Sequence, residues 1–231
     1  MMMEIKTFTC KKHGDFKARA IVCLGMEISP TCPLCQKELD DAEAREIAER
    51  EEYDKNGRIS VWAERANIPK LYRRREQMIP NGNQVEALNY AFDRNLIIVG
   101  SVGTGKTMVA SHLGMKAIEQ HKTVRYLYAS DIATRVKDTW GSKVISEREV
   151  IDDLIACDLL ILDEIGRCEY NEWIFKVLDG RYMEQRPTIF TGNIDVKELP
   201  KILGDAIASR LRTNVKVITF GETDQRKARV A

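Results

Sequence analysis

The chain has 231 residues, of which 44% are hydrophobic and 31% charged, and its formal net charge at pH 7 is +1. This composition is typical of a globular domain with a small appendage, and the near-zero charge argues against a protein that coats nucleic acid through bulk electrostatics. The sequence contains neither an apolar run of about 18 residues nor a secretory h-region, so we expect a cytoplasmic protein without a membrane partner.

The first 35 residues hold four of the six cysteines, in a pattern typical of a metal site. Cys10-x-x-His13 is followed by Cys32-x-x-Cys35, and a two-residue spacing lets a tight turn aim two ligands at one ion. We therefore predict a zinc-ribbon-like knuckle over residues 1–37 with these four side chains as ligands. Because zinc with four protein ligands has no open position, its role should be structural.

Two other interpretations of this knuckle stay open. Cys23 could replace His13 as the fourth ligand, but it lies in a strand-like stretch without a partner two residues away, which favours a structural role. The four residues could also be a chance cluster of reduced cysteines. A ribbon of this size cannot bury enough apolar surface to fold alone, so metal binding would supply the missing free energy.

A charged segment over residues 38–67 follows, which we interpret as a helical linker. Residues 38–54 carry nine acidic and two basic side chains, whereas residues 55–75 carry seven basic and one acidic. The segment is rich in helix formers, and Asn56-Gly57 is a typical helix stop. We expect a solvated spacer helix that ends there, with a partner-binding helix as the alternative.

The run "IIVGSVGTGKT" satisfies the complete Walker A pattern of phosphate-binding loops. An apolar strand precedes the loop and a helical stretch follows it, so backbone N–H groups and the positive end of the helix face a phosphate chain. Lys106 should reach the β- and γ-phosphates of ATP, and the Thr107 hydroxyl should bind Mg²⁺. The residues expected to contact the nucleotide are Gly100, Ser101, Val102, Gly103, Thr104, Gly105, Lys106, Thr107 and Met108.

A second motif, "CDLLILDEIG", is a continuous apolar strand that ends in Asp163 and Glu164. An acidic residue at the carboxyl end of a strand in the same parallel sheet can hold magnesium through a water, which makes Asp163 the Walker B residue. Glu164 has the character of the base that orients the attacking water, so we expect hydrolysis of the nucleotide.

Strand-like and helix-like segments alternate through the rest of the chain. The expected strands are 95–100, 123–130, 157–166, 187–193 and 214–220, and the expected helices are 106–120, 131–140, 147–156, 171–185 and 199–213. This alternation predicts an α/β fold with a doubly wound parallel sheet that binds its ligand at the carboxyl ends of the strands.

Two residues after the Walker motifs are further candidates for the site. Asn193 ends a predicted strand, where its amide can sense the γ-phosphate or the lytic water; the alternative is a plain turn asparagine. Arg210 lies on a predicted helix with Arg212, and an arginine there can neutralise the γ-phosphate of a neighbouring subunit. A surface arginine on a solvated helix is the alternative.

These motifs together resemble the AAA+ ATPases of the DnaC/IstB group, and among them the DnaC-type replicative helicase loaders, including those encoded by phages. The resemblance covers residues 68–230. We place the AAA+ domain itself at residues 68–231. It rests on "ANIPKLYR", "GSVGTGKT", "YASDIATRVKDTW", "DLLILDEIG", "LDGRYMEQRPTIFTGN", "LGDAIASRLR" and "FGETDQRKARV".

The resemblance implies a role for each matching residue. It makes Asp163 the magnesium ligand, Glu164 the water activator, Asn193 the sensor and Arg210 the arginine finger. Arg226 matches the second sensor, which contacts the nucleotide of its own subunit, although Arg229 is the alternative. The zinc-ribbon-like N-terminus departs from the best-known loader, which has a helical helicase-binding region there, and the lid is short or absent.

The resemblance also implies partners. An AAA+ oligomer in an open spiral would use ATP to grip single-stranded DNA while it delivers a hexameric replicative helicase, and the N-terminal segment would bind the helicase. The basic stretch "KLYRRR" and the aromatic residues Tyr72 and Trp140 are the candidates for DNA contact.

Two other functions fit the same motifs. One is a transposition accessory ATPase of the IstB type, whose core motifs are nearly the same. The other is a zinc-dependent adaptor that uses ATP only as an assembly switch, against which Glu164 argues. Cys157 and Cys168 flank the Walker B strand as expected core residues, and His112 and His121 have no assigned role.

Overall fold

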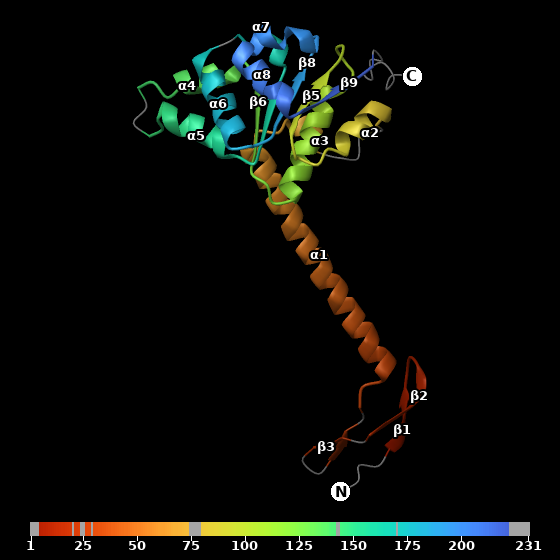
Figure 1. Ribbon diagram of the computed structural model, residues 1–231. Coiled ribbons are helices and arrows are strands. Elements are labelled where there is room, and N and C mark those ends of the chain that lie inside the picture. The colour runs from red at the N-terminus through yellow and green to blue at the C-terminus, as the bar shows by residue number, and fades with distance from the viewer. Residues whose placement is uncertain are drawn as a thin grey trace. The chain divides into compact units, whose positions relative to one another are not determined.

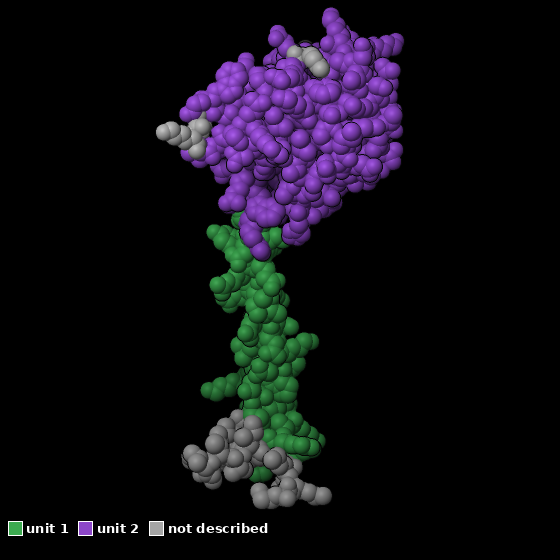
Figure 2. Space-filling view, turned by 60° about the vertical axis from the view of Figure 1, so that its left-hand side comes forward, with its two compact units in different colours: residues 1–57 green, residues 58–231 purple. Residues whose placement is uncertain are grey.

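The fold is described by a computed structural model, which contains two compact units, Met1–Gly57 and Arg58–Ala231 (Figure 2). The structure describes residues 5–19, 21–23, 26–28, 30–73, 80–141, 144–169 and 171–221. For residues 21–23 and 26–28 it describes the backbone alone. None of the described helices is both long enough and apolar enough to span a membrane.

Unit 1 contains two short antiparallel ribbons and the first part of a long helix. Strands β1 (Ile5–Cys10) and β2 (Gly14–Arg19) form the first ribbon, and β3 (Ile21–Cys23) pairs with β4 (Met26–Ile28) in the second. The turn between β1 and β2 ends at Gly14, whose φ of 76° is a conformation that glycine adopts without strain.

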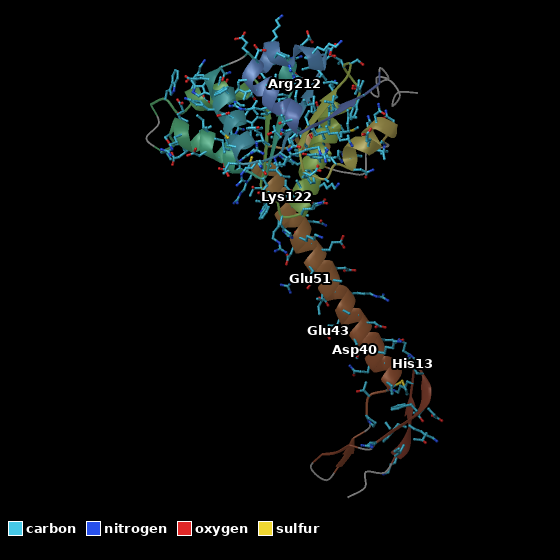
Figure 3. The ribbon with its side chains drawn as sticks, in the orientation of Figure 1. His13, Asp40, Glu43, Glu51, Lys122 and Arg212 are labelled. Atoms are coloured by element: carbon cyan, nitrogen blue, oxygen red, sulfur yellow. The ribbon has the colours of Figure 1, made fainter. Side chains whose placement is uncertain are left out.

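Helix α1 (Pro33–Arg65) is solvated over most of its length, and Figure 3 shows acidic side chains such as Glu43 along it. The expected stop at Asn56-Gly57 is wrong, because the helix continues to Arg65. The end is formed instead by Asn67, whose φ is 58°. Its N–H bonds to the Glu64 carbonyl at 2.9 Å and the Ile68 N–H bonds to the Ala63 carbonyl at 3.0 Å, which is a Schellman motif.

Tertiary packing explains why Gly57 does not end the helix. A glycine inside a helix costs about 1 kcal/mol relative to alanine. Ala63 in the last turn of α1, and Ala66 and Ile68 just after it, are buried in the core of unit 2. Burial of this turn offsets the cost of one glycine, a gain that the local sequence does not reveal.

Unit 2 is built on a five-stranded parallel sheet in the order β6-β7-β8-β5-β9 (Figure 1). Its strands are β5 (Asn95–Val99), β6 (Val124–Tyr128), β7 (Leu159–Asp163), β8 (Thr188–Gly192) and β9 (Val215–Thr219). The predicted parallel α/β sheet is therefore confirmed. Strand β5 has neighbours on both sides and delivers the Walker A loop at its carboxyl end, where such sheets bind ligands.

Helices cover both faces of this sheet. They are α2 (Gly82–Leu88), α3 (Lys106–Glu119), α4 (Asp131–Lys137), α5 (Glu147–Ala156), α6 (Glu172–Met183), α7 (Leu199–Leu203) and α8 (Asp205–Thr213). Along β5, Leu96 and Ile98 join a core with α2, α3 and the end of α1, whereas Ile97 and Val99 join a second core with α4 to α8. This alternation follows from the two-residue period of a strand.

The single helix expected over 199–213 is wrong. The chain forms α7 and α8 with Gly204 between them, at φ 79° and ψ 153°, a conformation outside the helical region. The interruption changes the direction of the chain between α7 and α8. Leu203 of α7 and Ile207 of α8 are both buried in the same core.

Arg181 of α6 is the largest fully buried side chain among the described residues, with 1% of its surface exposed. Its guanidinium donates to the carbonyls of Leu154 at 2.8 Å, Cys157 at 2.8 Å and Pro187 at 2.6 Å, and to Thr188 Oγ1 at 2.9 Å. Arg181 therefore joins the end of α5 to the start of β8. Burial lowers the pKa of this guanidinium, which stays a donor because its ordinary pKa is so high.

Candidate nucleotide site and metal centre

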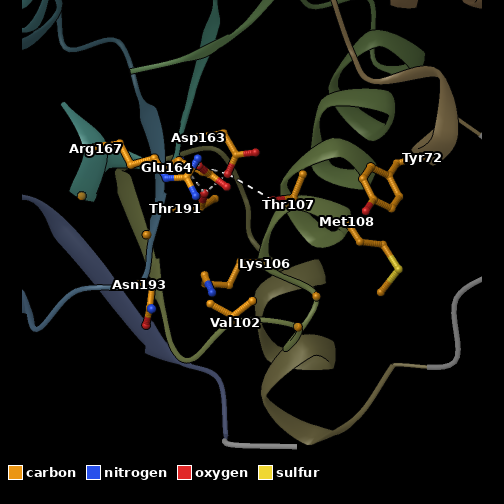
Figure 4. A pocket seen from close by; sticks show the side chains of 14 residues that line it. Tyr72, Val102, Lys106, Thr107, Met108, Asp163, Glu164, Arg167, Thr191 and Asn193 are labelled. Carbon is orange, nitrogen blue, oxygen red and sulfur yellow. Dashed lines mark hydrogen bonds and ion pairs between the residues drawn. The ribbon is translucent and has the colours of Figure 1, made fainter. Parts of the chain in front are cut away.

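A cavity of about 330 Å³ opens at the carboxyl ends of β7 and β8 and is also lined by the Walker A loop. Figure 4 shows Lys106 and Thr107 on one wall, and Asp163, Glu164 and Asn193 on the other. Segments that lie almost 90 residues apart in the sequence thus meet at one site, as the motifs predict.

The Walker A loop approaches its surroundings so closely that glycine is required. Gly100 has φ 150°, and a Cβ there would lie 2.7 Å from the Phe220 carbonyl oxygen. Gly103 and Gly105 have φ values of 85° and 87°. Helix α3 begins directly after Gly105 without a side-chain cap, so its first N–H groups can bind a phosphate.

The expected nucleotide-binding residues divide into two groups in the structure. Val102, Gly103, Gly105, Lys106, Thr107 and Met108 line the cavity. Gly100, Ser101 and Thr104 support the loop instead: Lys106 Nζ donates to the carbonyls of Gly100 at 2.8 Å and Ser101 at 2.7 Å. The Thr104 carbonyl accepts from Gln84 Nε2 of α2 at 2.9 Å.

Asp163 is 1% exposed and accepts hydrogen bonds at both carboxylate oxygens. Oδ1 accepts from the Thr191 hydroxyl, from Thr107 Oγ1 at 3.3 Å and from the Glu164 N–H at 3.1 Å. Oδ2 accepts from the Tyr126 hydroxyl. The hydroxyl and carboxylate oxygens of Thr107 and Asp163 are hard donors of the kind that Mg²⁺ prefers, so this pair fits the ion.

Glu164 follows β7 in a left-handed backbone conformation, with φ 54° and ψ 47°. Its Oε2 lies 2.9 Å from Nη1 of Arg167, and both residues line the cavity. Asn193 is exposed at the end of β8 and lines the same cavity, where it can reach a phosphate. The structure therefore brings both predicted residues to the lining of one cavity.

Sequence reasoning missed three side chains at this site: Arg167, Thr191 and Tyr126. Thr191 and Tyr126 lie within buried strands, where a hydroxyl needs a hydrogen-bond partner. That need was the available signal, but only the strand order shows that the partner is Asp163. Tyr72, expected as a DNA contact, lines the nucleotide cavity.

Arg210 does not line the cavity of its own chain. It lies on α8 against α6, where its Nη1 is 2.5 Å from Asp179 Oδ1, an ion pair without the alignment of a hydrogen bond. Its guanidinium carbon is 5.8 Å from the ring centre of Phe175 and 5.6 Å from that of Tyr182. Arg226 and Arg229 lie outside the described residues.

Unit 1 brings Cys10, His13, Cys32 and Cys35 together, with all four ligand atoms within 4.8 Å of one another. His13 Nδ1 lies 3.8 Å from the sulfurs of Cys10 and Cys32 and 3.3 Å from that of Cys35. Tetrahedral zinc with Zn–S bonds of about 2.3 Å separates its ligands by about 3.8 Å. The cluster therefore fits zinc in donor type and spacing.

Neighbouring groups orient this cluster. The second ring nitrogen of His13, Nε2, lies 3.2 Å from Glu38 Oε1, so the carboxylate can hold the ring with Nδ1 towards the three sulfurs. The backbone N–H groups of Lys12 and His13 lower the pKa of the Cys10 thiol to about 6, which favours the thiolate that zinc binds. The Cys23 side chain lies outside the described part of the chain, so the alternative with Cys23 stays a prediction.

The chain was compared with known proteins. Residues 83–228 match the family model described as "IstB-like ATP binding protein". The replicative helicase loader DnaC of Escherichia coli strain K12 is 31% identical over an alignment of 146 residues that covers 60% of this chain and 60% of that protein. A putative ATP-binding protein of insertion sequence IS232 from Bacillus thuringiensis subsp. berliner is 28% identical over 135 residues, covering 54% of this chain and 53% of that protein.

Solved structures match the same region. AMPPCP-bound DnaA from Aquifex aeolicus superposes with a TM-score of 0.55 at 22% identity, covering 66% of this chain and 51% of that chain. A structure titled as the DnaC helicase loader gives a TM-score of 0.54 at 19% identity, covering 65% and 99%. The chain spans about 60% of the length of the DnaC relative it matches. On the family model and the shared fold, the chain belongs to the IstB/DnaC family of AAA+ ATP-binding proteins.

Proposed function

We propose that this protein is a helicase loader, which binds and hydrolyses ATP to deliver a hexameric replicative helicase onto single-stranded DNA. The observation that supports ATPase activity is the arrangement of Asp163 and Glu164 opposite Lys106 and Thr107 across one cavity. Similarity to proteins named as replicative helicase loaders supports the choice of client.

Five side chains of the cavity have a proposed task in hydrolysis: Lys106, Thr107, Asp163, Glu164 and Asn193. The α3 N-terminus and Lys106 bind the β- and γ-phosphates, while Thr107 and Asp163 hold Mg²⁺, which supplies positive charge against these phosphates. Glu164 orients the attacking water and accepts its proton. Asn193 hydrogen-bonds the γ-phosphate or that water, so it reports which nucleotide is bound.

Arg210 completes the site of a neighbouring subunit in an AAA+ oligomer. In its own chain it lies away from the cavity, between two rings of α6. The γ-phosphate charge that it would neutralise therefore belongs to another copy, which makes hydrolysis dependent on assembly. Arg226 is proposed as the second sensor, with Arg229 as the alternative.

Trp140 is the aromatic residue that best fits the DNA contact. It is 63% exposed, and its ring packs edge-on against Trp173 with ring centres 6.3 Å apart. Lys137 Nζ lies 5.8 Å from the centre of the Trp173 ring, so positive charge lies beside the aromatic pair. An exposed ring next to a cation is the combination that binds bases and phosphates of a single strand.

Unit 1 is proposed as the helicase-binding element, with zinc as its structural metal. The family match begins at residue 83, so unit 1 lies outside the ATP-binding region that the family shares. A surface specific to the client fits such a separate unit.

The test asks whether a hexameric helicase co-purifies with the full chain, and whether Cys32→Ser abolishes this while nucleotide binding persists. Glu164→Gln should retain ATP binding and lose hydrolysis by about 100-fold or more. Unchanged turnover in Glu164→Gln would remove Glu164 from its role. Negligible turnover in the wild-type protein would favour the adaptor alternative.

A transposition accessory ATPase is the second candidate, and the IS232 relative supports it. The same purification distinguishes the two, since co-purification with a transposase in place of a helicase would select the second.

A further inference from the structure

A hydrogen bond between two buried side chains lies directly behind the candidate magnesium site. The Tyr126 hydroxyl of β6 donates to Oδ2 of Asp163 at the end of the neighbouring strand β7. Tyr126 is 3% exposed and Asp163 is 1% exposed. Because bulk water cannot substitute, Asp163 Oδ2 depends on the Tyr126 hydroxyl for its described donor, whereas Oδ1 has three donors of its own.

The two oxygens of Asp163 have different surroundings. Oδ1 accepts from Thr107 and Thr191 and is the oxygen on the side of the Walker A threonine. Oδ2 accepts from Tyr126, which belongs to the core shared by α3 and β6. Because Tyr126 engages Oδ2, the carboxylate keeps Oδ1 towards Thr107, where the cation would lie.

The Tyr126 hydroxyl is suited to act only as a donor here. A phenol hydroxyl has one proton to donate and an ionised carboxylate can only accept, so the hydrogen bond between Tyr126 and Asp163 runs in one direction. A phenylalanine would fill the same space in the core without supplying this donor.

We propose that Tyr126 is a positioning residue for the metal: it fixes the Asp163 carboxylate in the orientation that binds Mg²⁺ with Thr107. The inference rests on the proposed binding of Mg²⁺ with ATP at this cavity, and assigns to that site a residue outside the Walker motifs. Partners that orient a metal-binding side chain typically change metal affinity by about 10- to 100-fold when they are removed.

The experiment measures metal affinity through binding rather than turnover. A fluorescent ATP analogue is bound to the full-length protein in EDTA, and Mg²⁺ is then titrated in until the signal saturates. In Tyr126→Phe the Mg²⁺ concentration at half-saturation should rise about 10- to 100-fold. Binding of the analogue in EDTA should stay within about twofold, because the phosphate-binding loop is unchanged.

Tyr128→Phe is the matched control. Tyr128 lies two residues further along the same strand, is 45% exposed, and has its ring centre 6.4 Å from that of Tyr126. Loss of its hydroxyl should leave the Mg²⁺ midpoint unchanged. An equal shift in both variants, or no shift in Tyr126→Phe, overturns the proposal.

A double-mutant comparison keeps the test valid if the single variant does not fold. Asp163→Asn removes the buried charge that needs the hydroxyl, so adding Tyr126→Phe to it should cause no further rise in the Mg²⁺ midpoint. A further rise of the size expected for the single variant would show that Tyr126 acts independently of Asp163, and would overturn the inference. If the wild-type protein binds the analogue without any Mg²⁺ dependence, the proposed site itself fails.

Discussion

Each of the two units of this chain is stabilised from within, and by a different kind of interaction. Unit 2 has apolar cores on both faces of a parallel sheet. In unit 1, Cys32 is the one buried side chain among those described, and it belongs to the metal cluster. With zinc in the proposed site, one part of the chain would be stabilised by burying apolar surface and the other by gathering four metal ligands.

The two candidate sites also differ in completeness. All four proposed zinc ligands come from one unit of one chain. The nucleotide cavity contains the Walker residues and Asn193, but not Arg210. A structural metal centre can therefore form as the chain folds, whereas the proposed ATPase also requires assembly.

Removing the proposed zinc should have the largest effect, and unit 1 alone should respond, because all four proposed ligands lie there. Structural zinc contributes about 10–16 kcal/mol to small domains at pH 7, more than a ribbon without an apolar core can replace. A chelator under reducing conditions should make the amides of β1 and β2 exchange rapidly while those of the parallel sheet stay protected, as measured by hydrogen exchange. Two results would contradict this expectation. One is that β1 and β2 stay protected in the chelator, and the other is that protein purified under reducing conditions contains no stoichiometric zinc.

Arg210→Ala tests the incompleteness of the nucleotide site. Arginine fingers contribute about 10³- to 10⁵-fold to turnover, so this variant alone should lose most of its ATPase activity. Mixing it with Lys106→Ala subunits should partly restore activity, since each variant supplies what the other lacks. Steady-state ATPase assays of co-assembled mixtures measure this, and Arg212→Ala serves as the neighbouring control. Absence of recovery in proven co-assemblies would place Arg210 outside the active site.

Arg181→Met tests the stability of unit 2, where a buried cation supplements the apolar cores. Methionine fills similar space but leaves the carbonyls of Leu154 and Cys157 without their donor, so unfolding should become easier by about 2–4 kcal/mol. Urea denaturation followed by tryptophan fluorescence measures the change. Arg148→Met, at an exposed position, should shift stability by less than about 0.5 kcal/mol. Equal shifts in both variants would mean that burial of Arg181 is irrelevant.

Glu38→Gln has the smallest expected effect and tests how sharply unit 1 depends on the orientation of one ligand. The change weakens the hydrogen bond between residue 38 and His13 Nε2 but keeps all four zinc ligands, so the zinc affinity should fall about 10-fold. Competition with a chromophoric chelator measures the affinity. Glu43→Gln on the same helix is the control and should match the wild type; a similar loss there would point to net charge rather than to the hydrogen bond.

Features with strict local spacing were predictable from the sequence. The metal ligands and the Walker A loop depend on two-residue spacings and on glycines, and the strand and helix alternation predicts the parallel sheet. Features that depend on distant partners were not. Asn56-Gly57 has the composition of a helix stop, yet α1 continues because its last turn is buried in unit 2.

The same reason explains the residues that were missed around the site. Tyr126 and Thr191 look like ordinary strand residues until the strand order places them beside Asp163. Arg181 lies on a helix whose charged residues are otherwise expected at the surface, and only the packing of α5 and β8 shows its partners. Side chains that serve a site from neighbouring strands therefore need the fold before they can be recognised.

The left-handed backbone at Glu164 has a consequence for the evolution of stability. A residue other than glycine in this conformation carries about 1 kcal/mol or more of strain, which glycine would relieve. Selection for a more stable fold alone would favour a glycine at this position, whereas selection for the proposed hydrolysis would keep the carboxylate. A stability screen blind to activity should therefore enrich Glu164→Gly, which marks this position as one where folding and function oppose each other.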